Sequence, residues 1–570
     1  MLNKPAQENP DNAAFAILFA WAMTLILSAT ITLHTWKTGV FADTDDAARM
    51  VQIRDWMAGQ AWYDLKLHRM GLPDAPFMHW TRIVDIPIAG LIRFFELFLD
   101  QTAAERIARI VFPLSLIAVL LMTASLILRE LLLRNMLVPG LLIVALSGIS
   151  TGHLRPGRID HHGPQVLLFL IICLFLLRSM NKRAPFLNGL LCGGIASLSQ
   201  AISLENLPLI FVAAAIFALR WMIHGENARS AFRGFSAGLF AATPILFLLT
   251  TPPENWLAPL CDAQSIVHVL TFSTIAATCL ILTSTAPFLS TLPRRTAALV
   301  LAGIPGLILV LSVFPQCADP YSAIDPLVRR LWLDNVTEAE SLFEAISGDF
   351  GTIFPQLGPG IAGFAGAVFC ALKTKAAQRE KWIVIIAMTG AALVVSAYKI
   401  TGLASLSIIG AIGIAGTLDH LPEFYRRFRN LFAIAFSGVG VFALFPAQPT
   451  DPYKMETFDC LAPEAYASLD KLPTGLILAH INFGAHILAH TNHSTVAAPY
   501  HRNNEGNRIS VEVFQNSSKI NPLHVIESGA DYIVICQGTG SSKLEAAFLE
   551  AFPKLELIDR NMFSVWRMTR

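Results

Sequence analysis

Long apolar segments alternate with short polar ones over the first 447 residues of the chain. A helix that crosses the hydrocarbon core of a bilayer needs about 20 mostly apolar residues. Thirteen windows meet this requirement and predict spans at about 13–33, 106–128, 135–152, 163–179, 186–203, 206–222, 232–250, 266–288, 297–315, 355–372, 382–398, 401–417 and 430–447. The first window is too long for a cleaved signal peptide and lacks a small-residue cleavage site, so we expect a retained helix.

The basic residues between these windows predict the orientation of the chain. Lys and Arg collect in cytoplasmic loops. If the N-terminus lies inside, every short inner loop carries such a cluster, namely Arg129 and Arg134; Arg178, Lys182 and Arg183; Arg220, Arg229 and Arg233; Arg294 and Arg295; Lys373, Lys375, Arg379 and Lys381; Arg426, Arg427 and Arg429. Thirteen spans then place the C-terminus outside. We expect a multi-pass protein of the cell inner membrane with a cytoplasmic N-terminus.

The larger polar segments all fall on the predicted outer, periplasmic face. They are 34–105, 153–162, 203–206, 251–265, 316–354 and 448–570. Of the 15 histidines, only His224 and His420 are assigned to the inner side. Transporters usually hold their ionisable residues near the middle of the membrane. This distribution therefore favours chemistry at the outer membrane surface.

The composition changes after residue 448. Short β-type runs at Leu476–His480, Tyr532–Cys536 and Phe563–Trp566 alternate with helical stretches such as Ser542–Ala551. We therefore predict a polytopic α-helical membrane domain at 1–447 and a small α/β extracytoplasmic domain at 448–570.

The overall composition agrees with a membrane protein. Of 570 residues, 54% are hydrophobic and only 15% are charged. A soluble chain carries about a quarter charged residues. The net charge of +1 gives no basic excess for binding nucleic acid.

Eight cysteines divide between the two environments. Cys173, Cys192, Cys279 and Cys370 fall within spans, where a thiol is usually a small apolar filler, and Cys261, Cys317, Cys460 and Cys536 fall outside. The outer four permit three pairings, and disulfides are allowed there. We predict Cys460–Cys536 within the tail, with Cys261–Cys317 as the secondary pairing.

Three carboxylates follow the first span within four residues. Asp43, Asp45 and Asp46 predict a site for a hard divalent cation, because carboxylate oxygens suit Mg²⁺ or Mn²⁺. The alternative is a helix N-terminus that begins here, with Asp43 or Thr44 as its cap. The two interpretations are compatible.

The loop at 153–162 contains a second candidate group. Asp160 and His162 are two residues apart, so an extended segment points both side chains to one side. Together they suit a divalent ion, and cap or loop residues are the alternative. Arg155 and Arg158 offer guanidinium groups that match phosphate oxygens.

Other outer residues offer weaker signals. Glu338 lies in an acidic stretch that predicts either an amphipathic interfacial helix or a loop that closes over a substrate. His79 and Arg82 lie in an aromatic and basic stretch that suits a sugar or lipid-phosphate site, or an interfacial anchor. In the tail, His486 and Tyr500 are candidate contacts, although no acidic partner completes a zinc motif.

Together these motifs resemble the GT-C glycosyltransferases, and most closely the catalytic subunit of oligosaccharyltransferase. Asp43 precedes Arg49 by six residues, as the family's first-loop Asp precedes an Arg. The resemblance implies that Asp43, Asp160 and His162 bind the metal, with Asp45 or Asp46 as the spare ligand. It also implies that Glu338 in Asn335-Val-Thr-Glu338 orients the acceptor, and we expect the catalytic residues to be Asp43, Asp45, Asp46 and Glu338. The family's Trp-Trp-Asp-Tyr-Gly signature is missing, and Asn482–His486 is the corresponding stretch.

The resemblance implies an enzyme that uses a lipid-linked sugar. We expect transfer of a sugar or oligosaccharide from a polyprenyl-phosphate donor to a glycan, lipid or protein acceptor, with Mg²⁺ or Mn²⁺ as cofactor. Arg155, Arg158, His79 and Arg82 would then bind the donor phosphate, and Glu338, His486 and Tyr500 the acceptor. The alternatives are a transporter or flippase for lipid-linked sugars or polymers, and a non-catalytic assembly or sensor protein.

Overall fold

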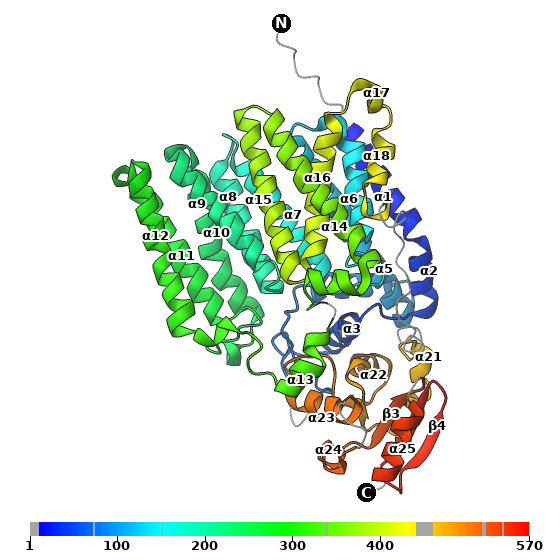
Figure 1. The fold of residues 1–570 in the computed structure, drawn as a ribbon. Helices are drawn as coiled ribbons and strands as arrows, with labels where there is room; N and C mark the ends of the chain where they lie inside the picture. The colour runs from blue at the N-terminus through cyan, green and yellow to red at the C-terminus, as the bar shows by residue number, and fades with distance from the viewer. Residues whose placement is uncertain are drawn as a thin grey trace.

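The computed structural model describes residues 11–71, 75–150, 152–336, 338, 340–440, 460–515, 520–538 and 541–568. Long helices stand side by side in a bundle, and the tail domain with the C-terminus lies at the end opposite the N-terminus (Figure 1). The long helices are α1 (Asp11–Leu27), α2 (Ala29–Thr38), α5 (Gln101–Glu130), α6 (Leu137–Ser150), α7 (His162–Ser179), α8 (Pro185–Ile202), α9 (Leu207–His224), α10 (Glu226–Thr250), α11 (Ile266–Ser284), α12 (Leu292–Ile308), α14 (Leu342–Lys373), α15 (Ala376–Tyr398) and α16 (Gly402–Asp419). The predicted helical membrane class is confirmed.

The count of spans is lower than the thirteen windows. Within the described residues, ten helices are long and apolar enough to cross a membrane, and α1 with α2 forms an eleventh candidate bent by 55°. The helix α6 has 14 residues and falls below that length. The last window begins with α18 (Arg429–Ala435), and its remainder from 441 to 447 lies outside the described residues.

Two helices pack through small residues. Gly189 and Gly193 of α8 face Gly234 and Gly238 of α10, and each pair is spaced four residues apart. A Cβ atom on Gly193 would lie 2.3 Å from the Phe235 carbonyl oxygen, which is closer than atoms approach. Small residues at this spacing let helix backbones touch in a membrane.

The polar loops are folded elements as well. The first loop contains α3 (Thr44–Met57) and α4 (Asp85–Phe95), and the late loop contains α13 (Pro326–Leu331). The helix α14 begins at Leu342, well before the window that starts at 355. The Ser341 hydroxyl accepts a hydrogen bond from the Glu344 backbone N–H, and the Glu344 carboxylate accepts one from the Ser341 backbone N–H. This capping box extends the helix into the segment predicted as loop 316–354.

The tail contains a five-stranded sheet in the order β2-β1-β3-β5-β4. The strands are β1 (Leu476–Ala479), β2 (Ser494–Thr495), β3 (Tyr532–Cys536), β4 (Glu556–Arg560) and β5 (Phe563–Arg567). The first three in this order are parallel, and β5 pairs antiparallel with both β3 and β4. Helices α21 (Pro463–Tyr466), α22 (Gly484–His490), α23 (Asn504–Phe514), α24 (Pro522–Glu527) and α25 (Ser541–Ala551) complete it. All three predicted strands are present, whereas β2 and β4 were not predicted.

Both predicted disulfides are formed. Cys460 is bonded to Cys536 within the tail, and Cys261 is bonded to Cys317, which joins the α10–α11 loop to the segment before α13. The four cysteines within spans are free and buried.

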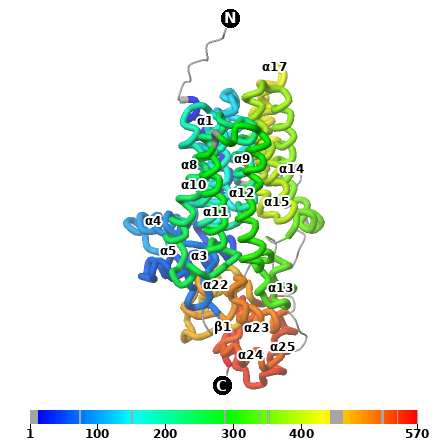
Figure 2. The backbone as a smooth tube through the Cα atoms, turned by 90° about the vertical axis from the view of Figure 1, so that its left-hand side faces the viewer, coloured from blue at the N-terminus to red at the C-terminus, as the bar shows by residue number. Residues whose placement is uncertain are grey.

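The tail packs directly on the first polar loop. In both views α3 lies between the bundle and α22 (Figures 1 and 2). The Arg54 guanidinium donates to the Ala489 carbonyl at 2.5 Å, and Arg69 donates to the carbonyls of Leu488, Thr491 and His493. Apolar residues of α3 and α22 share one buried cluster. The boundary proposed at 447/448 lies outside the described residues, and the parts on either side share this interface.

Candidate functional site

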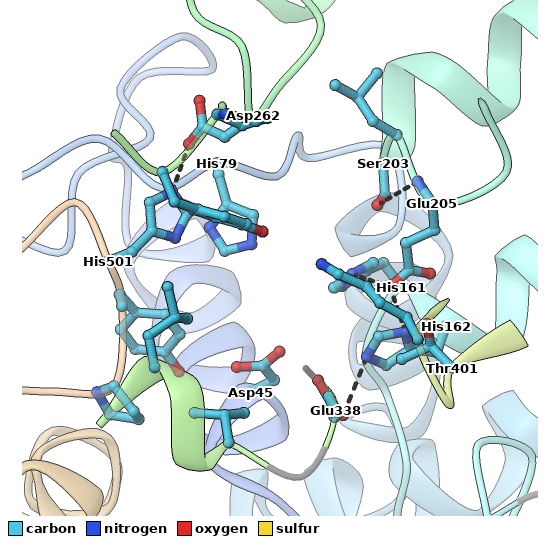
Figure 3. Close-up of a pocket in the computed structure, with 18 of the residues that line it drawn as sticks. Asp45, His79, His161, His162, Ser203, Glu205, Asp262, Glu338, Thr401 and His501 are labelled. Carbon is cyan, nitrogen blue, oxygen red and sulfur yellow. Dashed lines mark hydrogen bonds and ion pairs between the residues drawn. The ribbon is translucent and has the colours of Figure 1, made fainter. Parts of the chain in front are cut away.

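A cavity of about 1400 Å³ opens at the end of the bundle that meets the tail. Its walls come from the first polar loop, the start of α7, the α8–α9 connection, the α10–α11 loop, the segment before α14 and the tail. Figure 3 shows two groups of polar side chains on opposite walls, Asp262, His79 and His501 on one and Glu205, His161 and His162 on the other.

The three first-loop carboxylates have different environments. Asp43 caps α3, where its Oδ1 accepts from the Asp45 backbone N–H at 3.2 Å. Asp46 is fully buried, and its Oδ1 accepts from the backbone N–H groups of Ile159 at 2.6 Å and Asp160 at 3.1 Å. Asp45 lines the cavity. Asp43 therefore caps the helix while Asp45 contributes an acidic group to the cavity, and the sequence was compatible with both roles.

Arg158 joins the two acidic motifs. Its guanidinium lies 2.8 Å from Asp43 Oδ2 and 3.5 Å from Asp46 Oδ2, and it also binds Asp160. Burial raises the pKa of Asp46 to about 7 even though Arg158 opposes this shift. Burial would raise the pKa of Asp160 too, but Arg158 outweighs it and holds that pKa well below the usual range. Arg158 is thus engaged by carboxylates and is poorly placed for the predicted phosphate contact.

Two sets of residues among those described bring ligand atoms within 4.8 Å of one another. One is Asp45, His161 and His162, and the other is His153, Asp160 and His162. Among the described residues, buried His161 Nδ1 has no hydrogen-bond partner, and buried His162 Nε2 has only the Glu338 carboxylate, at 3.4 Å. The donor set of imidazole and carboxylate fits a divalent cation. Asp43 belongs to neither set, and Asp45 takes the place predicted for Asp43.

Two glutamates complete this wall. Glu205 Oε1 lies 2.8 Å from His162 Nδ1, and Glu338 Oε1 lies 3.4 Å from His162 Nε2. Burial would raise the pKa of Glu205, but attraction by His162 and then His161 outweighs it and lowers that pKa well below its usual value. Burial and the carboxylates of Asp43 and Glu338 raise the pKa of Asp45 well above its usual value. A cation bound at Asp45 would relieve this repulsion.

The remaining predicted residues divide into two groups. His79, His486 and Tyr500 line the cavity, and the Tyr500 hydroxyl donates to the Thr44 carbonyl at 3.0 Å. Arg82 and Arg155 are not among its lining residues. Arg82 is buried, and its guanidinium donates to the carbonyls of Gln52, Trp62 and Asp64 and to the Gln60 side chain. These bonds use four of its five N–H groups within the first loop, so Arg82 is poorly placed to bind a phosphate.

Sequence reasoning missed Asp262, Lys399 and His501, which line the cavity, and His153, which belongs to one candidate metal set. Lys399 lies 5.4 Å above the Tyr321 ring, and no carboxylate among the described residues lies within 4 Å of its amine. In the sequence, Lys399 directly follows the predicted span at 382–398, and no motif surrounds it. Asp262 is the one of these residues that the sequence could have marked, because it lies next to Cys261 in a predicted outer loop.

No protein-family model matches the sequence, and no curated protein matches it. The fold does have solved counterparts. The oligosaccharyltransferase of Archaeoglobus fulgidus, tethered to an acceptor peptide that contains the NVT sequon, superposes with a TM-score of 0.68 and 14% identity over 95% of this chain and 71% of that chain.

This chain has the GT-C fold.

Two further GT-C structures share the arrangement. The Archaeoglobus fulgidus enzyme AglB, in complex with an inhibitory peptide and a dolichol-phosphate, gives a TM-score of 0.64 at 13% identity over 90% of this chain and 69% of that chain. The mycobacterial arabinofuranosyltransferase AftD gives 0.51 at 12% identity over 99% of this chain and 42% of that chain. The predicted GT-C likeness is confirmed for the fold.

Proposed function

We propose that this protein is a membrane glycosyltransferase that transfers a sugar from a polyprenyl-phosphate-linked donor to an acceptor at the outer face of the membrane. The observation that carries the proposal is the cavity in which Asp45, His161, His162 and Glu338 meet from three distant segments. Such a meeting of carboxylates and imidazoles within a GT-C fold supports sugar transfer more than transport.

The cavity has walls for both parts of a lipid-linked donor. Phe211, Phe272 and Val394 come from the helices α9, α11 and α15 and offer apolar contacts for an isoprenoid chain. Lys399 lies at the end of α15 in the same cavity and offers an ammonium group for the phosphate. AglB binds a dolichol-phosphate, which is a ligand of the same chemical class. We therefore assign the phosphate to Lys399 in place of the engaged Arg158 and Arg82.

The acidic wall supplies the electrostatics of the transfer. Asp45, His161 and His162 would hold a divalent cation, and such an ion stabilises the negative charge that develops on a departing phosphate. Imidazole ligands favour Mn²⁺ over Mg²⁺ at this position. Glu338 contacts His162 and comes from the segment before α14, so it would orient the acceptor beside the donor.

The predicted topology gives the site its location. The basic clusters assign the end with the N-terminus to the cytoplasm. The cavity and the tail would then face the periplasm of an inner-membrane protein. A lipid carrier presents its sugar at that surface, where no nucleotide-sugar domain is needed.

The test is genetic and chemical together. Deleting the gene should remove one surface glycan and cause a polyprenyl-phosphate-linked sugar to accumulate, both measured by mass spectrometry. Wild-type protein and Glu254→Gln, which changes an exposed outer carboxylate, should restore the glycan, whereas Asp45→Asn should not. An unchanged lipid-linked sugar pool in the deletion strain, or full restoration by Asp45→Asn, would contradict the proposal.

A further inference from the structure

A second polar cluster lies on the cavity wall opposite the candidate metal ligands (Figure 3). His501 Nε2 lies 2.6 Å from Asp262 Oδ2, and both residues line the cavity. The His79 ring lies 5.1 Å from the His501 ring, and the Tyr321 ring stands edge-on to it at 5.4 Å. The cluster therefore joins the α10–α11 loop, the first loop and the tail.

The hydrogen bond to Asp262 fixes the tautomer of His501. Arg502 holds Asp262 through two bonds, Nε to Oδ2 at 2.7 Å and Nη2 to Oδ1 at 2.8 Å. Burial would raise the pKa of Asp262, but its bonds to His501 and Arg502 outweigh this and hold that pKa far below its usual value. An ionised carboxylate only accepts hydrogen bonds, so Nε2 carries a proton, and in the neutral imidazole Nδ1 then has the lone pair. Among the described residues Nδ1 has no hydrogen-bond partner.

The cluster is held in place from several sides. Arg502 donates to the carbonyls of Phe77 and Met78, directly before His79. The Cys261–Cys317 disulfide fixes the residue next to Asp262. The side chains of His501 and Asp262 are 15% and 11% exposed. A basic nitrogen is thus held rigidly at the edge of the cavity.

The first-loop carboxylates are occupied in other ways. Asp43 is bound to Arg158, Asp46 accepts backbone N–H groups, and Asp45 belongs to a candidate metal set. The opposite wall therefore offers a base that is independent of the metal ligands. The two walls approach each other at His79, whose ring lies 6.4 Å from that of His161.

We propose that the acceptor is a hydroxyl compound, such as a sugar, and that His501 removes its proton during transfer. The inference rests on the proposed function. The acceptor oxygen forms a bond to the anomeric carbon of the donor, and the bond from that carbon to the phosphate oxygen breaks. The electron pair leaves with the polyprenyl phosphate, and the acceptor proton moves to His501 Nδ1. Asp262 is a positioning residue, because it acts through His501.

The chemistry of the base selects the class of acceptor. A hydroxyl oxygen becomes a competent nucleophile when a neutral imidazole accepts its proton in the transition state. The nitrogen lone pair of a carboxamide is delocalised into the carbonyl, so a proton acceptor of this strength does not activate it. The wall with Asp262 and His501 therefore favours an alcohol over an asparagine side chain.

The experiment uses full-length protein in detergent and solubilised membranes of the deletion strain, which hold the donor and the unmodified acceptor. Released polyprenyl phosphate gives the rate, and linkage analysis of the product identifies the bonded atom. His501→Gln keeps an N–H for Asp262 but loses the base. We expect its rate to fall by about 10²–10⁴-fold, while lipid binding and the thermal midpoint stay unchanged.

A matched control and a pH profile distinguish a catalytic role of His501 from a structural one. His68→Gln alters another His–Asp pair, 2.7 Å from Asp64 but with a 58% exposed imidazole outside the cavity lining, and should keep the wild-type rate. The pH–rate profiles of wild type and His501→Gln should differ, because only the wild type carries the base. The charged and titratable groups that face His501 are Asp262, Arg502, His79 and Tyr321, with Lys399 above Tyr321.

Each outcome decides one of the two proposals. An oxygen-linked product with a slow His501→Gln variant supports the inference. A nitrogen-linked product, or a His501→Gln variant as fast as wild type with the same pH profile, overturns it and leaves the glycosyltransferase intact. If wild-type protein releases no polyprenyl phosphate from these membranes, the proposed function itself fails.

Discussion

At the scale of single residues, Arg158 determines how the acidic motifs are arranged. It contacts the carboxylates of Asp43, Asp46 and Asp160, which lie in two loops more than a hundred residues apart. Removing one partner of a buried charge group leaves the others uncompensated, which costs far more than losing an exposed ion pair.

Arg158→Gln should lower the free energy of unfolding by about 3–5 kcal/mol, because three partly or fully buried carboxylates lose their cation. The measurement is the thermal midpoint of the protein in detergent. Arg93→Gln is the control, since Arg93 pairs with Glu96 at 3.0 Å with a 60% exposed side chain. The control should change stability by less than about 1 kcal/mol. Equal midpoints for both variants would show that Arg158 does not hold the loops together.

Glu338 gives a second test at this scale. Glu338→Gln should reduce sugar transfer by about 10²-fold or more, because it removes the carboxylate that faces His162. Glu344→Gln should leave the rate near wild type, because Glu344 caps α14 and has no place in the cavity lining. The rates of polyprenyl phosphate release compare the two. A fully active Glu338→Gln protein would show that the segment around Glu338 has only a structural role as a cover of the cavity.

The sequence predicted part of this site for local reasons. Asp160 and His162 are two residues apart in a short loop and belong to one candidate metal set, although α7 begins at His162 and the segment is not extended as predicted. Asp43 and Asp45 both line the cavity, and which of them joins a candidate metal set was beyond prediction, because it depends on the geometry of the helix cap. Lys399 and His501 required the tertiary fold, since no neighbour in sequence marks them.

At the scale of elements, the long helices were predictable because a bilayer demands about 20 apolar residues whatever their packing. The start of α14 was missed although Ser341 and Glu344 have the spacing of a capping box. The strands β2 and β4 were missed because a two-residue strand and an exposed edge strand carry little hydrophobic pattern.

The contact between α8 and α10 makes its own prediction. Gly193→Ala should lower the free energy of unfolding by about 1–3 kcal/mol, because the added Cβ meets the α10 backbone. Gly194→Ala is a matched control on the same helix, since nothing lies within 4 Å of its Cβ position. That control should stabilise the helix by about 0.5–1 kcal/mol. Thermal midpoints test both, and a stabilising Gly193→Ala would refute the close packing.

At the scale of the whole molecule, the orientation in the membrane is the property that remains to be measured. Reporter fusions at residues 183, 295 and 427 should be cytoplasmic, and fusions after residue 450 external, because the basic clusters lie in the inner loops. Alkaline phosphatase and fluorescent protein fusions provide complementary signals. An external signal at 295 would contradict the predicted alternation of inner and outer loops. Part of the bundle would then have the opposite orientation in the membrane.

The interface between the first polar loop and the tail has a consequence for biogenesis. A ribosome delivers α3 early and the tail last, yet Tyr500 and His501 line the same cavity as Asp45. The helices can therefore be inserted one by one while the cavity is still open. The cavity acquires its last wall only when the tail has docked onto α3. If the protein is the glycosyltransferase proposed above, a chain whose tail has not docked should be inactive towards the lipid carrier.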